Sequence, residues 1–382
     1  MDKYKYNNDP DGPFGLQKGC FIRRCAITIS KAIVLRIDIH YLDFRKIIYK
    51  IKIDPSNGKN RLIGDASPLQ QVADYVAVGL SIDIFKRRIV PQQISSIPGR
   101  GPIYGTRMIQ RWIDEDNRAM RWARKHNVRY SRKCKWYVKL DVSQCFPSLR
   151  VDRFMRLYKR DCANTDLLWF YEALLRTHAI DGYEGFMIGS RVSQDACQYM
   201  MSFIFRFAKS LHYYRRGVEL KSVTHMLIQM DDILMFGSSR KELKAAVEQV
   251  IVYAKSFLGL NIKPNWQILN LDMSPVDIVG YKLYANGKVS IRSRIFLRAR
   301  RMVLRFTRND HFTYEQAKRL SSYKGYFEDN GRAKIVAKHK HSDSRTIRNK
   351  MELDEAFRGA QKIVSITERR MLYGDSGIHS AA

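Results

Sequence analysis

A pair of adjacent acids lies between two short apolar runs in the second half of the chain. The run 226–228 precedes the link 229–232, which reads Gln-Met-Asp-Asp, and the run 233–236 follows it. Short apolar runs on either side of a short polar link are typical of two strands joined in a hairpin. We therefore predict a hairpin with Asp231 and Asp232 at its tip.

A third apolar run, residues 136–140, also has the pattern of a strand, and it ends in the acid Asp141. Strands from distant segments can meet in one antiparallel sheet, so Asp141 is expected beside Asp231 and Asp232. Two alternatives stay open at this point. The acidic pair also suits a solvated turn, and Asp141 also suits a helix cap or a turn.

Apolar positions at helical spacing predict most of the other elements. Helices are predicted over 69–90, 108–125, 151–176 and 193–213, and another after Ser239. Residues 21–53 alternate in the manner of strands, most clearly over 33–39, and the polar residues 1–20 predict a loose arm. The chain is thus expected to combine helices with an antiparallel sheet.

The three acids also predict a kind of chemistry. Two like charges beside an apolar core are costly unless a cation neutralises them. Carboxylate oxygens are the ligands that Mg²⁺ and Mn²⁺ prefer. Asp141, Asp231 and Asp232 therefore predict a site for two such ions, and two-metal sites of this kind catalyse phosphoryl and nucleotidyl transfer.

Composition narrows the possible partners. The chain has 382 residues, 45% of them hydrophobic, which suits one enzyme of several subdomains. Its net charge of +31 favours a polyanionic partner and salt-sensitive binding. The six cysteines show no CxxC pairing, which favours reduced thiols in the cytoplasm over a zinc site. The polar start and the lack of a long apolar run predict no signal peptide and no membrane partner.

The positive charge is densest late in the chain. Residues 292–308 contain seven arginines and no acid, several of them three or four positions apart. This spacing places them along one face of a helix, with an apolar face that includes Leu297 and Val303. Such a face can contact the phosphates of a duplex without reading its bases. A generic solvated basic helix is the alternative.

Several segments resemble the sequence motifs of retroelement-type reverse transcriptases. Residues 141–148 resemble motif A, 188–194 motif B, 229–232 motif C, 257–263 motif D, and 276–281 the primer grip of motif E. Residues 58–63, followed by Pro68, resemble the fingertip strands. These motifs occur in the order of the family and cover roughly residues 50–330.

The resemblance implies an α+β fold of the right-hand polymerase type, with fingers, a palm of antiparallel sheet plus helices, and a helical thumb. The expected parts are a flexible N-terminal arm at 1–20, fingers at 21–134, a palm at 135–286 with a fingers segment at about 150–190, a thumb at 287–345, and a C-terminal extension at 346–382. It also implies RNA-directed DNA polymerase activity.

The resemblance also implies roles for individual residues in catalysis. Asp141 and Asp231 would bind the two Mg²⁺ or Mn²⁺ ions directly, and Asp232 would lie nearer the primer end. Lys263 would protonate the departing pyrophosphate, or it is an ordinary surface lysine. Phe146 takes the place of the steric gate, where an aromatic ring collides with a ribose 2′-hydroxyl, so it favours a DNA product. Core packing is its alternative role.

Further residues would bind substrate or nucleic acid. Lys59 and Arg61 would contact the triphosphate of the incoming dNTP, unless they belong to a solvated basic hairpin. The motif B contacts would come from Ile188, Gly189, Ser193 and Gln194. The template–primer contacts would come from Gly280 and Tyr281 in the primer grip and from Arg292, Arg294, Arg298, Arg301 and Arg305 in the thumb.

Motif B points to a subfamily. Ile188 and Gln194 stand where most retroelement enzymes have Gln and Pro, which resembles the enzymes of diversity-generating retroelements. That resemblance implies error-prone cDNA synthesis from a structured template RNA, a small basic oligomeric accessory protein, and a cytoplasmic enzyme encoded by a bacterium or phage. Gln229 departs from the usual Tyr of motif C. A defence-associated or retron-like reverse transcriptase is therefore an alternative, and a catalytically dead nucleic-acid-binding scaffold is a more distant one. An RNA-dependent RNA polymerase is disfavoured by Phe146.

Overall fold

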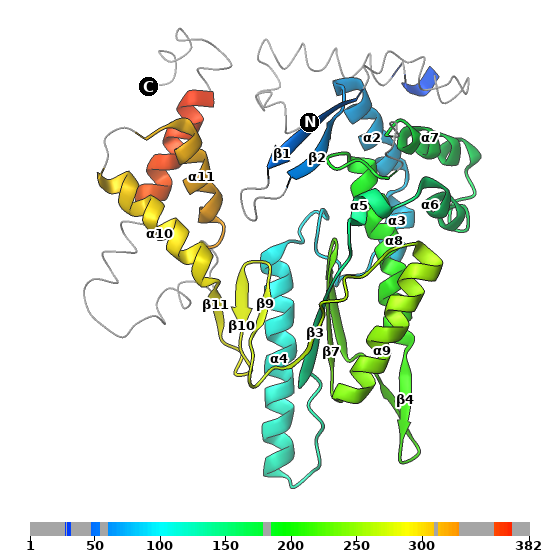
Figure 1. Cartoon of the computed structure of the whole chain (residues 1–382), viewed down its shortest axis with the longest axis vertical. Coiled ribbons are helices and arrows are strands. Elements are labelled where there is room, and N and C mark those ends of the chain that lie inside the picture. Colours follow the sequence, from blue (N-terminus) through cyan, green and yellow to red (C-terminus); the bar gives the residue numbers. More distant parts are fainter. Residues whose placement is uncertain are drawn as a thin grey trace. The chain divides into compact units, whose positions relative to one another are not determined.

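The computed structural model describes residues 27, 29–31, 47–53, 60–178, 185–308, 312–327 and 355–368. The chain divides into two compact units, one from residues 1–105 and 127–270 and the other from 106–126 and 271–382. Each unit therefore joins two stretches that are far apart in sequence (Figure 1). The first unit contains all of the predicted catalytic acids.

The first unit is built on a four-stranded antiparallel sheet with the strand order β6-β7-β3-β8. Its strands are β3 (Trp136–Asp141), β6 (His225–Gln229), β7 (Asp232–Gly237) and β8 (Ile268–Asn270). The predicted hairpin is confirmed as the pair β6–β7, and the predicted third strand is β3, which lies beside β7. The side chains of β7 from Ile233 to Gly237 are all buried, so both faces of this strand are covered. Its register is given by the pairing of Asp232 with Asp141 on one side and with Gln229 on the other.

The helices of the first unit pack against this sheet and against one another. They are α2 (Pro68–Leu80), α3 (Ile82–Arg88), α5 (Cys145–Ser148), α6 (Val151–Tyr158), α7 (Thr165–Arg176), α8 (Arg191–Ser210) and α9 (Arg240–Tyr253), which continues as the π-turn η2 (Ala254–Leu258). Polar N-caps start several of them: the side chains of Ser67, Asn164, Ser190 and Ser239 each accept a hydrogen bond from a backbone N–H in the first turn. The helix predicted after Ser239 is confirmed as α9, and the helical stretches 69–90 and 151–176 are confirmed but are each divided into two helices. The helix predicted over 193–213 ends at Ser210, because residues 212–215 form strand β4.

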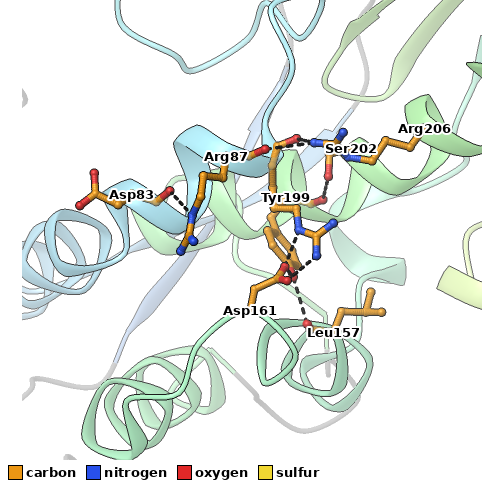
Figure 2. A network of polar contacts seen from close by, with 8 residues as sticks. Asp83, Arg87, Leu157, Asp161, Tyr199, Ser202 and Arg206 are labelled. Atoms are coloured by element: carbon orange, nitrogen blue, oxygen red, sulfur yellow. Dashed lines mark hydrogen bonds and ion pairs between the residues drawn. The ribbon is translucent and has the colours of Figure 1, made fainter.

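A polar network joins three of these helices (Figure 2). Arg88 of α3 forms an ion pair with Asp161, which follows α6. The hydroxyl of Tyr199 on α8 donates to Asp161 and to the carbonyl of Leu157. The guanidinium of Arg206, further along α8, donates to the backbone carbonyls at the end of α3. Bidentate and charge-assisted bonds of this kind hold helices in a fixed orientation. They tie α8 to α3, which precedes β3 in the chain, and to α6, which follows it.

Two hairpins complete the described part of the first unit. Strands β1 (Ile48–Ile53) and β2 (Asn60–Asp65) form one, and β4 (His212–Arg215) and β5 (Val218–Lys221) form the other. Strand β1 accords with the alternation seen over 21–53, but residues 27 and 29–31 are helical rather than extended. The run 33–39 and the arm at 1–20 lie outside the described residues.

The second unit combines a small sheet with helices. Strands β9 (Val276–Ile278), β10 (Tyr281–Leu283) and β11 (Val289–Ile291) are antiparallel in the order β11-β10-β9. Helices α10 (Ser293–Arg308) and α11 (Tyr314–Lys324) share one hydrophobic cluster with a helix over 355–368, through residues that include Val303, Leu320 and Phe357. Thr313 and Gln316 form a capping box at the start of α11. Part of the predicted C-terminal extension therefore packs in the same core as α10 and α11.

Helix α4 (Pro102–Lys125) confirms the helix predicted over 108–125, and most of it belongs to the second unit. There, the side-chain amide of Gln110 donates to the carbonyl of Gly287 at 2.9 Å, and that of Asn117 donates to the carbonyl of Ala285 at 2.8 Å. These bonds attach α4 to the turn between β10 and β11. Within the described ranges, no helix has the length and apolar character needed to cross a membrane.

Candidate active site

The three predicted acids meet at one edge of the four-stranded sheet. Asp141, the last residue of β3, is the cross-strand partner of Asp232, the first residue of β7. Asp231 lies in the turn before β7, and its carbonyl accepts a hydrogen bond of 3.0 Å from the backbone N–H of Val142. Cross-strand partners have Cβ atoms within about 5.5 Å of each other, so these carboxylates are close neighbours. The alternatives of an isolated solvated turn and a lone cap acid do not describe this arrangement.

Both acidic segments pass through unusual backbone conformations. Met230, between Gln229 and Asp231, has φ +55°, and Gln144, just after the Asp141 strand, has φ +45°. Side chains other than glycine cost about 1–2 kcal/mol in this left-handed region. Such conformations persist where the surrounding structure enforces them, and they cluster at functional sites. The tight turn at Met230 lets β7 begin at once after Asp231.

Burial raises the pKa values of the carboxyl groups of Asp231 and Asp232, and it is the largest cause for both. The negative charge of Asp141 raises them further. Arg61 on β2 and Lys263 oppose the shift at Asp231, so the fingertip cation Arg61 acts electrostatically on the acids. Ionised carboxylates crowded in this way are a favourable environment for a cation. Lys59, the other predicted triphosphate contact, lies outside the described residues.

Lys263 lies directly beside the acids. Its ammonium donates to Oδ2 of Asp141 at 2.6 Å, and its backbone N–H donates to the carbonyl of the same residue at 2.9 Å. The segment 261–263 runs alongside the end of β3, because Ser143 also donates its N–H to the carbonyl of Asn261. This lysine adjoins the three acids, and its pairing with Asp141 is a contact that its position in the sequence does not reveal.

The donor chemistry of this edge suits Mg²⁺ or Mn²⁺. All three acids offer hard carboxylate oxygens, and the buried Oδ1 of Asp141 has no hydrogen-bond partner. Among the described residues, however, no three His, Cys, Asp or Glu side chains converge as they would around a bound ion. Asp141 is instead paired with Lys263. The residues therefore fit a divalent ion in type and charge, while their side chains are not yet gathered around one.

Phe146 lies on α5, directly after the left-handed Gln144. Its ring is half-buried at the margin of the main hydrophobic core, and its carbonyl accepts a 2.9 Å hydrogen bond from Phe186. The backbones approach closely here, because a Cβ added at Gly185 would lie 2.4 Å from the carbonyl oxygen of Pro147. This contact ties the segment of Phe146 to the segment that leads into motif B. The core-packing role and the gate role are compatible with a ring in this half-buried position.

Motif B forms one wall of a pocket of about 170 Å³, which is also lined by the end of β2 and by α2. Gly189 and Gln194 are among its lining residues, and Gly189 has φ +114°, a conformation that glycine adopts without strain. The carbonyl of Ile188 accepts a hydrogen bond from the N–H of Gly64. Ser193 differs from the others: it is fully buried, and its hydroxyl contacts Nδ1 of His178 at 3.3 Å. Gly189 and Gln194 thus line the pocket, whereas Ser193 supports α8 from inside.

A model of the reverse transcriptase family, described as reverse transcriptase (RNA-dependent DNA polymerase), matches residues 84–283. The match covers more than half of the chain and includes all three acids and Lys263. The chain belongs to the reverse transcriptase family. The predicted fold class, an α+β right-hand polymerase fold, is confirmed by this match together with the helices and antiparallel sheets.

The solved structures with similarity to this reverse transcriptase include telomerases. The apo telomerase from Candida tropicalis is 12% identical with a TM-score of 0.45, over 92% of this chain and 72% of that chain. A form truncated from its C-terminal domain is 14% identical with a TM-score of 0.42, over 64% of this chain and 54% of that chain, so the match spans about half its length. The telomerase from Candida albicans in complex with a TWJ fragment of telomeric RNA is 11% identical with a TM-score of 0.40, over 84% and 61%. No curated protein matches the chain.

The predicted primer-grip residues belong to the second unit of this reverse transcriptase. Gly280 lies in the tight turn between β9 and β10 with φ +89°, and a Cβ there would meet the ring of Tyr326 at 2.6 Å. The side chain of Tyr281 is buried, with its ring 5.6 Å from that of Tyr326. The Tyr281 ring therefore packs within the unit, and a primer contact at this turn would fall to the backbone.

The arginine face of α10 is present with two differences from its prediction. Arg294, Arg301 and Arg305 are exposed and Arg298 is half-buried. Arg292 precedes the helix and is ion-paired with Asp277, so its guanidinium holds the β9–β11 sheet to the start of α10. Leu297, expected on the apolar face, is 45% exposed, whereas Ala299 and Val303 are buried. The face available to a polyanion thus consists of the remaining four predicted arginines.

The sequence pattern did not predict a buried pair of glutamines, Gln93 and Gln198, that packs against Met230 in the turn before Asp231. The amide of Gln198 on α8 donates to the carbonyl of Ser95 at 3.0 Å and to the sulfur of Met230 at 3.4 Å. Its oxygen accepts from the amide of Gln93 at 2.8 Å, and both glutamines are fully buried. Buried polar groups that are satisfied in this way fix a unique geometry. The sequence does hold a clue to this pair: Gln198, a polar residue, occurs one helical turn after Gln194 among the apolar residues of α8.

Neutralising Arg294, Arg298 and Arg301 together with Gln is expected to weaken template–primer binding and to flatten its salt dependence. Each lost phosphate contact lowers the slope of log K against log salt by about 0.7–0.9, so three contacts lower it by about 2 to 3. Fluorescence anisotropy between about 50 and 200 mM salt measures the slope. The matched control replaces three exposed cations of the neighbouring helices, Lys318, Arg319 and Lys362, with Gln. An equal slope in the α10 variant and the native chain would mean that this face does not bind nucleic acid.

Proposed function

We propose that this chain is an RNA-directed DNA polymerase that makes cDNA from a structured template RNA by two-metal nucleotidyl transfer. The observation that carries this proposal is the cross-strand pairing of Asp141 with Asp232, with Asp231 on the adjoining turn. When bound, two divalent ions would activate the primer 3′-hydroxyl and neutralise the triphosphate. Asp141 and Asp231 would hold these ions, while Asp232 would lie toward the primer end.

Other residues of the same unit would position the nucleotide. Arg61 on β2 would contact the triphosphate, because its positive charge already acts on Asp231. Lys263 is placed to move from Asp141 to the departing pyrophosphate and to donate a proton there. Phe146 would close the space beside the sugar. Gly189 and Gln194 line the motif B pocket and would contact the nucleotide or the template there. The dead-scaffold alternative is disfavoured because all three acids are present at one edge of the sheet.

The test is extension of a DNA primer annealed to an RNA template, with dNTPs and Mg²⁺ or Mn²⁺. The proposal expects metal-dependent extension that stops when EDTA is added. Absence of extension with both metals, in a preparation that binds the primed template, would contradict the polymerase assignment. Extension only with ribonucleotides would favour an RNA polymerase instead.

The finer proposal is that synthesis is error-prone, as in diversity-generating retroelements. It rests on Ile188 and Gln194 of motif B, because an Ile side chain cannot hydrogen-bond a template or nucleotide as Gln can. With fewer hydrogen bonds to the nascent base pair, the free-energy difference between a matched and a mismatched nucleotide is smaller. A genomic neighbourhood with a near-repeat pair differing at adenines would separate this proposal from a defence-associated or retron-like enzyme.

Replacing Ile188 with Gln is expected to lower the error rate at template adenines. One added hydrogen bond is worth about 1.4 kcal/mol at most in net terms, which corresponds to about a tenfold change. Sequencing of the cDNA made by both enzymes on one template measures the change. Ile188→Leu, which adds no hydrogen-bonding group, is the control and should keep the original spectrum. Equal error spectra for the Gln variant and the native chain would count against this role.

A further inference from the structure

The hairpin β4–β5 projects from the first unit between the motif B helix α8 and the motif C strand β6 (Figure 1). Its strands pair from His212–Lys221 to Arg215–Val218, and two residues, Arg216 and Gly217, form the tip. Both tip residues have positive φ, +53° and +77°, which defines a type I′ turn. This turn matches the twist of the strands, so a two-residue connection suffices to hold the hairpin.

The two faces of the hairpin differ. Tyr213 and Leu220, a cross-strand pair, are half-buried and form the inner face. Toward the tip both faces are exposed: Val218, which shares the face of Tyr213 and Leu220, is 58% exposed, and Tyr214 on the opposite face is 74% exposed. An isolated two-stranded hairpin is marginally stable in water. The exposed tyrosine and valine lie on opposite faces and form no continuous apolar patch, so the charge of the hairpin is the better guide to what it binds.

The exposed part of the hairpin carries an excess of positive charge. Arg215, Arg216 and Lys221 are exposed cations, and Glu219 is its one acid. Burial, together with the nearby charge of Lys221, lowers the pKa of Lys209 at the base of the hairpin to about 8. Tyr214 lies on the face of Lys221 and donates its hydroxyl to Glu219 at 3.5 Å, while Arg215 lies on the other face and Arg216 at the tip. A net positive hairpin with an exposed ring matches the surface of a nucleic acid, in which phosphates alternate with stackable bases.

The arginine at the tip is costly for the turn. A type I′ turn prefers Asn, Asp or Gly at this position, and other side chains cost about 1–2 kcal/mol in the left-handed region. Arg216 therefore places a guanidinium at the tip against the local preference of the backbone. Arginine offers a planar set of donors that bind phosphate oxygens in pairs. We therefore attribute a binding function to the positive charge of Arg216, since the backbone at this position favours a different residue.

The hairpin is remote from the catalytic acids. It is closed at its base by a hydrogen bond of 3.0 Å from the N–H of Ser222 to the carbonyl of Leu211. The ammonium of Lys209 donates to the carbonyls of Val223 and Thr224, which lead into β6. The base of the hairpin therefore lies at the start of β6, whereas Asp231 follows the end of that strand. A strand of five residues spans about 16 Å, so the hairpin does not take part in the chemical step.

We propose that the β4–β5 hairpin binds the sugar–phosphate backbone of a folded RNA segment that lies outside the catalytic site. Arg215, Arg216 and Lys221 contact phosphates, and Tyr214 stacks on an unpaired base. RNA is the partner because the chain belongs to the reverse transcriptase family and its charge is strongly positive. The proposal rests on the proposed function, since it takes the polymerase's structured RNA as the ligand.

The test replaces Arg215 with Gln, Arg216 with Asn and Lys221 with Gln in one chain. Asn suits the left-handed tip, so the hairpin is retained while three charges are lost. The control chain replaces Arg156, Lys241 and Lys255, exposed cations of α6, α9 and η2, with Gln, which removes the same charge elsewhere. Anisotropy titrations use an RNA stem-loop, a DNA duplex of the same stem sequence, and a short primed RNA template.

The hairpin variant is expected to bind the stem-loop about tenfold or more weakly at about 100 mM salt, with a salt slope lower by about 2, while the control changes little. Primer extension on the short template should be unchanged in both chains, so a failed polymerase assay would count against the proposed function and not against the hairpin. An equal loss of stem-loop affinity in the hairpin and control variants would mean that only the net charge of the chain matters, and it would contradict a binding site on the hairpin. Unchanged stem-loop binding would overturn the proposal, and a loss confined to the DNA duplex would assign the hairpin to the product instead.

Discussion

Replacing Asp231 with Asn is expected to abolish DNA synthesis on a primed RNA template, with a loss of about a thousandfold or more. The substitution keeps the shape of the side chain and removes one of the carboxylates proposed to hold the metal ions. Metal-assisted charge stabilisation is worth several kcal/mol, and each 1.36 kcal/mol corresponds to a factor of ten in rate. Single-turnover extension with saturating dNTP measures the loss.

The loss should not come from unfolding. Burial and the neighbouring acids raise the pKa of Asp231, so its ionised form costs the folded state free energy at neutral pH. Asn removes that cost, and thermal unfolding at pH 7 without added metal should occur at the same temperature or higher. This stabilising effect should shrink as the pH falls through the raised pKa, where Asp231 takes up a proton in the native chain. Asp83→Asn, at an exposed position of α3, is the control for a lost acid. Full activity of the Asp231 variant would refute the assignment of the metal site.

Replacing Phe146 with Ala is expected to admit ribonucleotides. If the half-buried ring lies against the sugar, its removal opens room for a 2′-hydroxyl. Forcing extra atoms into a packed site typically costs 1–3 kcal/mol, so the preference for dNTP over rNTP should fall by about 10- to 100-fold. The ratio of kcat/KM for dGTP and GTP opposite template cytosine measures the change.

The matched control for this gate is Phe146→Tyr. Tyr keeps the aromatic ring, so the exclusion of ribonucleotides should persist. Because Phe146 also packs at the margin of the core, the Ala variant is expected to lose some stability, and both activities are therefore compared as a ratio. An unchanged ratio in the Ala variant, with dNTP activity retained, would leave core packing as the role of this residue.

The alternation of apolar runs and acids was sufficient to predict the central features of the first unit. Asp141, Asp231 and Asp232 follow or precede short apolar strands, and pairing of β3 with β7 along their whole length makes Asp141 and Asp232 partners. Helical periodicity likewise located α2, α4 and α8. In these elements, local pattern and tertiary packing favour the same structure.

Roles that depend on a partner from a distant segment could not be predicted in the same way. Ser193 faces His178, Tyr281 packs on Tyr326, and Arg292 pairs with Asp277. Each has a residue type that suits a substrate contact, and each is occupied by a neighbour that the sequence does not place beside it. The pairing of Lys263 with Asp141 and the glutamines beneath Met230 escaped prediction for the same reason.

Helix α4 has a consequence for how the protein is made. Gln110 and Asn117 find their partners at Gly287 and Ala285, yet the whole segment 127–270 is synthesised between them. At bacterial or eukaryotic rates of about 5–20 residues per second, this helix waits on the order of ten seconds for its partners to leave the ribosome. The sheet with the catalytic acids can assemble in that interval. A nascent chain halted once residue 270 has left the ribosome would therefore hold an assembled acidic edge and an α4 without its partners at Ala285 and Gly287, the surface on which a chaperone would be expected to act.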